Sequence, residues 1–184
     1  MDLKSFHNWV LALGLLGSGA PGLAGGFQPM DVDQLTRKAE IVLHAKVLGS
    51  QCQQDAEGRV YTRIELQVHE VWKGSVKSSP FVVVHGGGSL QRRHTVISGQ
   101  VEYSTGDEVV AFLVLNQRQE GVTLGLAQGK FSVWTDSATG KQMVGNAFHG
   151  SLPPQAQKMG ATATPSSSPV SLADLRKRVQ GARP

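Results

Sequence analysis

The sequence predicts a mainly all-β fold, a small barrel or sandwich built of short strands. Three observations lead to this prediction: apolar and polar residues alternate over several segments, glycine (22 residues) and proline (8 residues) are frequent, and the strand-like segments follow one another closely. Alternation with a period of two is typical of half-buried strands. Closely spaced strands separated by turn residues are typical of a barrel or a sandwich.

The first residues have the pattern of a secretory signal peptide. Lys4 precedes an apolar run over residues 9–16, and small residues then lead to a predicted cleavage site near Ala24. Such a run is too short to span a membrane comfortably as a permanent helix. We therefore predict a cleavable signal over residues 1–24, a secreted or periplasmic protein, and no stable membrane span after cleavage. An uncleaved N-terminal anchor is the alternative.

The first elements after the signal are predicted to be a short helix and two long strands. Residues 31–39 begin with an aspartate that can cap a helix and end with basic residues that suit the helix dipole. Every second residue of 41–48 is apolar, with His44 on the polar face, which predicts a half-buried strand. The alternation continues through 60–68, and its slip at 70–72 predicts a β-bulge or a strand end.

The second half of the chain contains six further predicted strands, at residues 81–84, 95–97, 109–115, 122–126, 130–134 and 141–144. The run 109–115 is the most apolar and is predicted to be the central strand, paired with 122–126 across a polar turn. The last two strands flank the turn-forming residues 135–140, which predicts a hairpin.

The composition divides the chain into a barrel domain over residues 25–150, a flexible linker over 151–169 and a C-terminal helix and tail over 170–184. Ser171 and Asp174 resemble a capping box at the start of this helix. Three apolar residues form a stripe along it, so we expect the helix to dock on the barrel. They are Leu172, Leu175 and Val179.

The order of several short segments resembles a family of known fold. The segments are Ala39–Val47, Tyr61-Thr62 in a long strand ending at Val71–Gly74, Gly106–Leu113 and Gln128–Phe131. In this order they resemble a set of exported bacterial proteins of unknown function and, more distantly, the netrin-like modules, which include the tissue inhibitors of metalloproteinases. The shared order covers roughly residues 33–135. The resemblance implies an OB-like, five-stranded, partly open barrel with a short N-terminal helix and a C-terminal helix.

The same resemblance does not carry the chemistry of those inhibitors with it. The inhibitors are rich in disulfides and present an N-terminal cysteine to the zinc of a protease. Here the predicted mature chain begins near Gly25, and its single cysteine, Cys52, lies far downstream. Cys52 has no partner for an internal disulfide and no basic neighbour in sequence to activate it, so we predict no catalytic thiol.

Residues His85-Gly86-Gly87-Gly88 match the oxyanion-hole tetrapeptide of lipases and esterases. That chemistry also requires a serine on a strand-to-helix turn, usually within Gly-x-Ser-x-Gly, and the sequence has no such pentapeptide. Three glycines equally allow a sharp turn after a strand. We therefore predict a turn here.

The histidines show no compact metal-binding spacing such as His-x-x-x-His. His44 and His69 lie on the polar faces of neighbouring predicted strands and could meet, but two histidines make an incomplete zinc site and no acidic residue evidently joins them. Asp107 and Glu108 follow a glycine and resemble a turn that enters a strand. We therefore predict surface histidines, no metal site and no other cofactor.

A basic segment follows the glycines, and together they are the predicted binding segment. Its candidate residues are His85, Gly86, Gly87, Gly88, Arg92, Arg93 and His94. Lys73, Lys77 and Lys130 could extend it into a basic patch. Because the formal net charge is only +4 and an exported protein rarely meets nucleic acid, we expect another exported protein or an anionic glycan as the partner.

The predicted function is therefore a non-enzymatic binding or accessory module of the cell envelope or exterior, with no catalytic residues. The partner would be another exported protein or an anionic glycan, and the hairpin near Asp136 is a second candidate surface. An inhibitor of an exported protease is the alternative. A hydrolase that uses the His-Gly-Gly-Gly segment is a third and less favoured possibility.

Overall fold

A computed structural model describes residues 29–90, 93–95, 97, 100–150 and 170–182. The predicted signal peptide and the predicted linker at 151–169 lie outside these residues. In the described part of the chain, no helix has both the length and the apolar character needed to cross a membrane.

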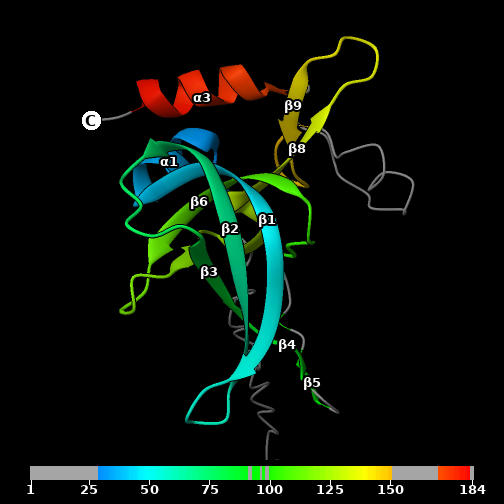
Figure 1. The fold of residues 1–184 in the computed structure, drawn as a ribbon. Helices are drawn as coiled ribbons and strands as arrows, with labels where there is room; N and C mark the ends of the chain where they lie inside the picture. The colour runs from blue at the N-terminus through cyan, green and yellow to red at the C-terminus, as the bar shows by residue number, and fades with distance from the viewer. Residues whose placement is uncertain (1–28, 91–92, 96, 98–99, 151–169, 183–184) are drawn as a thin grey trace, which may run out of the picture.

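Five strands form a closed β-barrel (Figure 1). Around the barrel they follow the order β1 (Ile41–Gln54), β2 (Val60–Lys73), β3 (Phe81–Gly86), β7 (Gly121–Thr123) and β6 (Glu108–Leu115), and β6 pairs with β1 to close it. Only β3 and β7 are parallel; the other neighbours are antiparallel. The prediction of a mainly β barrel is confirmed. The barrel is closed rather than partly open, because β1 pairs with both β2 and β6 along its first half.

Further strands extend the sheet on one side of the barrel. The strands β8 (Lys130–Thr135), β9 (Gln142–Gly145) and β10 (Val170–Ser171) follow β6 in that order, and β4 (Gly88–Leu90) and β5 (Arg93–Thr95) form a separate hairpin. The hairpin predicted around residues 135–140 is confirmed.

The strand predicted at 122–126 is too long. It ends at Thr123, because Gly125 and Leu126 have positive φ angles of 62° and 56° and the chain enters the 3-10 helix η1 (Leu126–Gly129). A left-handed backbone of this kind cannot continue a strand.

Both predicted helices are present. Helix α1 (Val32–Lys38) begins with a capping box, in which Asp31 Oδ1 accepts from the Gln34 N–H at 2.7 Å and Gln34 Oε1 accepts from the Asp31 N–H at 3.0 Å. Helix α3 (Leu172–Gly181) begins with Ser171, whose Oγ accepts from the Asp174 N–H at 3.1 Å. These caps satisfy N–H groups that have no partner within the helix.

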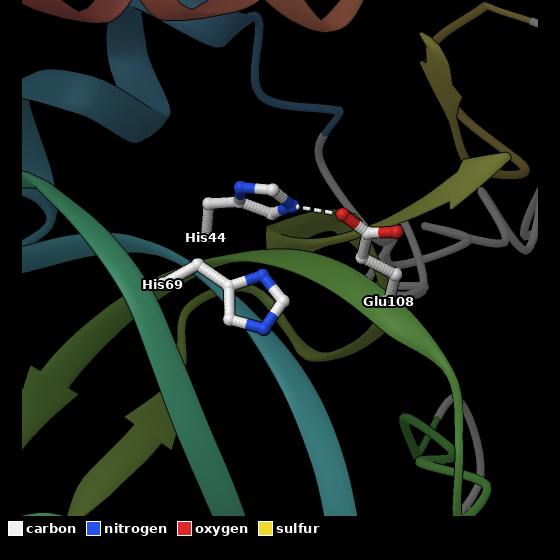
Figure 2. A group of neighbouring side chains, drawn as sticks. All are labelled: His44, His69 and Glu108. Carbon is white, nitrogen blue, oxygen red and sulfur yellow. Dashed lines mark hydrogen bonds and ion pairs between the residues drawn. The ribbon is translucent and has the colours of Figure 1, made fainter. Parts of the chain in front are cut away.

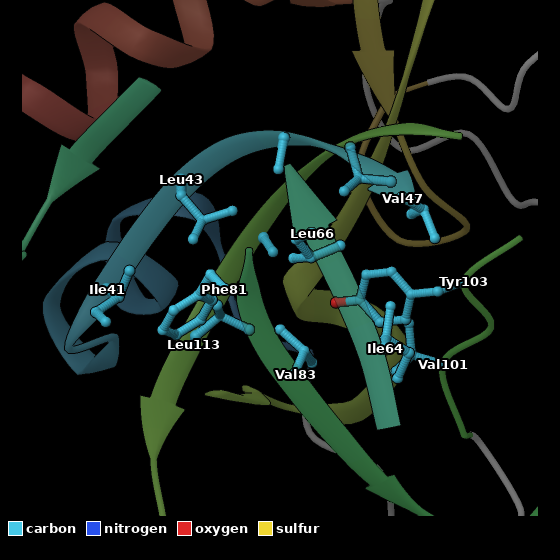
Figure 3. Close-up of a cluster of buried hydrophobic side chains, with 13 residues drawn as sticks. Ile41, Leu43, Val47, Ile64, Leu66, Phe81, Val83, Val101, Tyr103 and Leu113 are labelled. Carbon is cyan, nitrogen blue, oxygen red and sulfur yellow. The ribbon is translucent and has the colours of Figure 1, made fainter. Parts of the chain in front are cut away.

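An inner core fills the barrel (Figure 3). Tyr103, from the loop before β6, enters this core, and its hydroxyl lies 2.8 Å from Thr123 Oγ1. Burial raises the pKa of Tyr103 to about 12, so the phenol is neutral and pairs as a hydrogen-bonding group. The inner core consists of Ile41, Leu43, Ala45, Val47, Ile64, Leu66, Phe81, Val83, Val101, Tyr103, Val109, Ala111 and Leu113.

An outer core lies between the barrel wall and the two helices. Val42 and Phe112 point outward from the barrel and are covered by side chains that include Leu35 of α1 and Leu175 of α3. The prediction that the outer face of β1 is polar and exposed is therefore wrong over its first residues. The alternation in sequence identified the inner face, but it could not show that two helices cover the other face. The predicted docking of the C-terminal helix is confirmed.

Candidate functional site

A β-bulge in β2 turns two residues toward His44. His44 of β1 pairs with Glu70, and the next residue of β1 pairs with Val68. His69 is therefore the extra residue of β2. In such a bulge two residues of one strand oppose a single residue of the partner. The slip predicted at 70–72 is confirmed by a second register shift, in which Val42 pairs with Lys73 and Leu43 with Val71, so that Trp72 is also an extra residue. The bulge at His69 brings its ring against the ring of His44.

His44, His69 and Glu108 form the His-His-Glu cluster (Figure 2). Each residue offers one ligand atom, and these atoms all lie within 4.8 Å of one another. His44 Nε2 lies 2.6 Å from Glu108 Oε1, and the rings of His44 and His69 meet edge to face with their centroids 5.1 Å apart. The Gln142 side-chain amide donates to the same Glu108 oxygen at 3.3 Å.

The pairing of β1 with β6 brings Glu108 into the cluster. His44 lies opposite Val110, and Glu108 lies two residues before Val110 on the same face of β6. Diagonal neighbours in an antiparallel pair have Cβ atoms about 7–8 Å apart, which long side chains can bridge. The sequence analysis missed Glu108 because its place beside His44 depends on the register of two strands that are far apart in the chain.

The three side chains differ in exposure. His44 is only 9% exposed, so the prediction of a surface histidine is wrong for it and right for His69, which is exposed. The Glu108 side chain is 32% exposed. Two imidazoles and a carboxylate at this spacing can share a proton between His44 and Glu108 or provide ligands for a metal ion.

A groove of about 950 Å³ lies beside the cluster, between α3 and the barrel. We call it the α3 groove. His44 and Trp72 line it from the barrel, and the first residues of α3 line it from the opposite side. Gln142 at the start of β9 and Lys141 just before it also form part of the wall. Trp72 is 1% exposed and its Nε1–H donates to Glu70 at 2.9 Å, so its ring is held in place. His44 and Gln142 therefore belong to both the cluster and the groove.

Three cationic residues and two acidic ones, Glu70 and Asp174, line the α3 groove, and Asp174 accepts a hydrogen bond from the Ser171 hydroxyl. Arg176 forms an ion pair with Glu70, which also accepts from Trp72. Lys141 and Lys177 are exposed, and within the described residues no ion pair engages either of them. The groove thus carries two cationic groups that are available to an anionic ligand.

The glycines of the predicted binding segment serve packing and strand pairing. Gly87 and Gly88 have φ angles of 80° and 132°, and the Gly87 N–H donates to the Val60 carbonyl at 2.9 Å. A Cβ atom on Gly88 would lie 2.5 Å from Thr62 Oγ1. The Gly87 N–H is therefore engaged and does not face a developing oxyanion. In place of the predicted turn, Gly87 forms a one-residue break between β3, which ends at Gly86, and β4, which begins at Gly88.

His85 and Gly86 line a separate pocket of about 580 Å³. The ring of Tyr61 forms part of its wall, and the Arg118 guanidinium lies over that ring, 5.6 Å from the centroid. The His85 Nδ1 is 2.9 Å from the carbonyl oxygen of Gly86, which fixes the ring against its own strand. The first two residues of the predicted binding segment therefore form part of a hollow, whereas Gly87 and Gly88 are packing residues.

The basic half of the predicted binding segment is described only in part. Arg92 lies outside the described residues, and the backbone of Arg93 and His94 forms β5. Figure 1 places β4 and β5 at the end of the molecule opposite α3. The hairpin near Asp136 is present, with Asp136 Oδ1 accepting from the Ala138 N–H at 2.8 Å. That carboxylate is thus occupied within its own turn.

Two of the lysines that could have extended the predicted binding segment into a basic patch, Lys73 and Lys130, are engaged in contacts within the fold. Lys73 donates to the carbonyl of Thr36 at the end of α1, at 2.7 Å. Lys130 lies over the Tyr103 ring and donates to a backbone carbonyl, and burial lowers its pKa despite the nearby Asp107 carboxylate. Both lysines therefore stabilise the fold through contacts with residues distant in sequence. Their number and position in the sequence could not show these contacts.

Comparison of the chain with protein-family models gives no match, and comparison with curated proteins gives no match either. The netrin-like resemblance therefore stays a prediction, and the candidate sites have to be judged by their own geometry.

Proposed function

We propose that this protein is an exported, non-enzymatic binding module that holds an acidic segment of another exported protein in the α3 groove. The signal-peptide pattern of residues 1–24 supports export. The netrin-like resemblance supports a barrel that acts by binding. The observation that carries the proposal is the groove itself, with Lys141 and Lys177 at its walls.

The size and lining of the groove suit a polypeptide. Its volume of about 950 Å³ is at the upper end of the range of ligand pockets, which runs from about 300 to 1,000 Å³. Leu172 and Ala173 offer apolar contacts beside the two lysines. An extended segment with both acidic and apolar side chains can use both kinds of contact. Trp72 is buried and presents no exposed ring face on which a sugar could stack, which favours a protein over a glycan.

Charge reversal in the groove tests this proposal. The protein and its Lys141→Glu/Lys177→Glu variant would be used to capture proteins from the host envelope and culture supernatant, followed by mass spectrometry. We expect an exported protein that the variant loses, because the reversed charges repel carboxylates. A synthetic peptide copying an acidic segment of that protein should then bind the parent at least about 10-fold more tightly than the variant.

A matched control separates local charge from net charge. The Lys38→Glu/Lys77→Glu variant has the same net charge, but its two exposed positions lie away from the groove. It should retain the captured protein. Capture that is equal for both double variants, or enrichment of a glycan alone, would contradict the proposal. Capture lost only on Arg92→Ala/Arg93→Ala would move the interaction to the segment His85–His94.

A further inference from the structure

The His-His-Glu cluster has the donor set of a transition-metal site. Zn²⁺ is bound in proteins by imidazole nitrogens and carboxylate oxygens, and two histidines with one glutamate leave one of four tetrahedral positions open. Imidazole donors disfavour Mg²⁺ and Ca²⁺, which require oxygen ligands. His44, His69 and Glu108 together supply two nitrogens and one oxygen.

The spacing of the donor atoms lies within reach of zinc geometry. Metal–ligand distances of about 2.0–2.1 Å place tetrahedral ligand atoms about 3.3 Å apart. The His44–Glu108 pair, now 2.6 Å apart, would open by about 0.7 Å. The ligand atom of His69 lies within 4.8 Å of the other two ligand atoms and would have to move closer to them. Glu108 is a long, partly exposed side chain and His69 is exposed, so both can turn without disturbing the core.

The backbone around the cluster is held firmly. The three ligands come from β1, β2 and β6, and β1 is hydrogen-bonded to both of the other strands at this level of the barrel. His44 is packed against Trp72, with ring centroids 6.2 Å apart, and Gln142 donates to Glu108 from β9. Ligands on rigid strands with supporting partners favour metal binding, because little order has to be created when the ion arrives.

We propose that His44, His69 and Glu108 bind one Zn²⁺ ion, with water or an incoming ligand in the fourth position. This inference does not depend on the proposed binding of an acidic segment. Because His44 also lines the α3 groove, the ion would lie at its border, where exposed His69 keeps the site open to solvent.

Metal titration of the full chain tests the site. The protein, freed of metal by chelation, would be titrated with ZnCl₂ and separately with MgCl₂ by isothermal titration calorimetry. We expect one Zn²⁺ per chain and no Mg²⁺ binding at this site. The variants His69→Ala and Glu108→Gln should each weaken Zn²⁺ binding by about 10-fold or more, since each removes or neutralises a ligand. These two positions are chosen because they are not fully buried, whereas replacement of His44 would disturb the wall of the outer core.

Three further experiments keep the outcome decisive. His85→Ala removes a histidine near the other end of β2 and should leave Zn²⁺ binding unchanged. Co²⁺ in place of Zn²⁺ should give the visible absorption of a tetrahedral ion in the parent and lose it in His69→Ala. Thermal melting should show that both ligand variants stay folded. Absence of Zn²⁺ binding by the parent, or binding by His69→Ala and Glu108→Gln that is as tight as that of the parent, would overturn the proposal.

Discussion

Gly88 occupies a point where the β4–β5 hairpin lies against the first two strands of the barrel. A side chain there would meet both Thr62 Oγ1 at 2.5 Å and Cys52 Sγ at 2.8 Å, and its φ of 132° is unfavourable for any residue with a Cβ. Substitution of this glycine would thus disturb the fold even if the hairpin binds nothing.

We predict that Gly88→Ala lowers the free energy of unfolding by about 1–3 kcal/mol, through contact strain and an unfavourable backbone conformation. Gly49→Ala is the control, because a Cβ atom there meets nothing within 4 Å and its φ is not positive. It should change stability by no more than about 0.5 kcal/mol. Chemical denaturation of both variants measures the difference, and an equal effect would show that the contacts at Gly88 do not matter.

Single residues also show the limit of inference from sequence here. An interruption of the strand at the glycines was predictable, since glycine tolerates the positive φ angles that Gly87 and Gly88 adopt. His44 was placed on the correct face of β1, but its burial depends on the bulge in β2 and on covering elements that are remote in sequence. Glu108 was not recognised as a partner, because the register of β1 with β6 is not encoded locally.

At the scale of elements, the residues at which the two helices begin were the most predictable features. Asp31 and Ser171 are cap residues whose side chains accept from N–H groups within their own first turn, so the signal is local. The end of β7 was not predictable from alternation. The apolar period continues through Leu124 and Leu126, while the positive φ angles of Gly125 and Leu126 stop the strand.

The cap of α3 gives a measurable prediction. Ser171→Ala removes the acceptor of the Asp174 N–H and should cost about 1 kcal/mol of stability. Gln180→Ala changes an exposed position of the same helix and should be nearly neutral. Urea unfolding would compare the two variants. A Ser171→Ala variant as stable as the parent would mean that solvent satisfies the helix end equally well.

At the scale of the whole molecule, the two cores make the C-terminal helix part of the barrel domain. Leu175 and Val179 are buried against the same outer core as Val42 and Phe112. The sequence predicted a barrel and a docking helix, but a second core cannot be predicted from alternation, which identifies only one face of each strand. The boundary predicted at residue 170 therefore marks a change in amino-acid composition and does not separate two packing units, since the helix and the barrel share one core.

Truncation after residue 169 tests whether the barrel needs the C-terminal helix for its stability. Removal of β10 and α3 uncovers the outer core, so we expect a lower melting temperature and binding of the dye 1-anilinonaphthalene-8-sulfonate to the exposed apolar surface. Truncation after Ala182 keeps α3 and should behave as the parent. A variant ending at residue 169 that melts like the parent and binds no dye would show that the barrel is stable without its helix.

The position of α3 in the chain has a consequence for the order of events during synthesis. A chain that emerges with its N-terminus first makes β1, β2 and β6 long before residues 172–181, which complete the cover of the outer core. Until then Val42, Trp72 and Phe112 stay without part of their cover. Folding of this domain is thus completed only when its last helix is released.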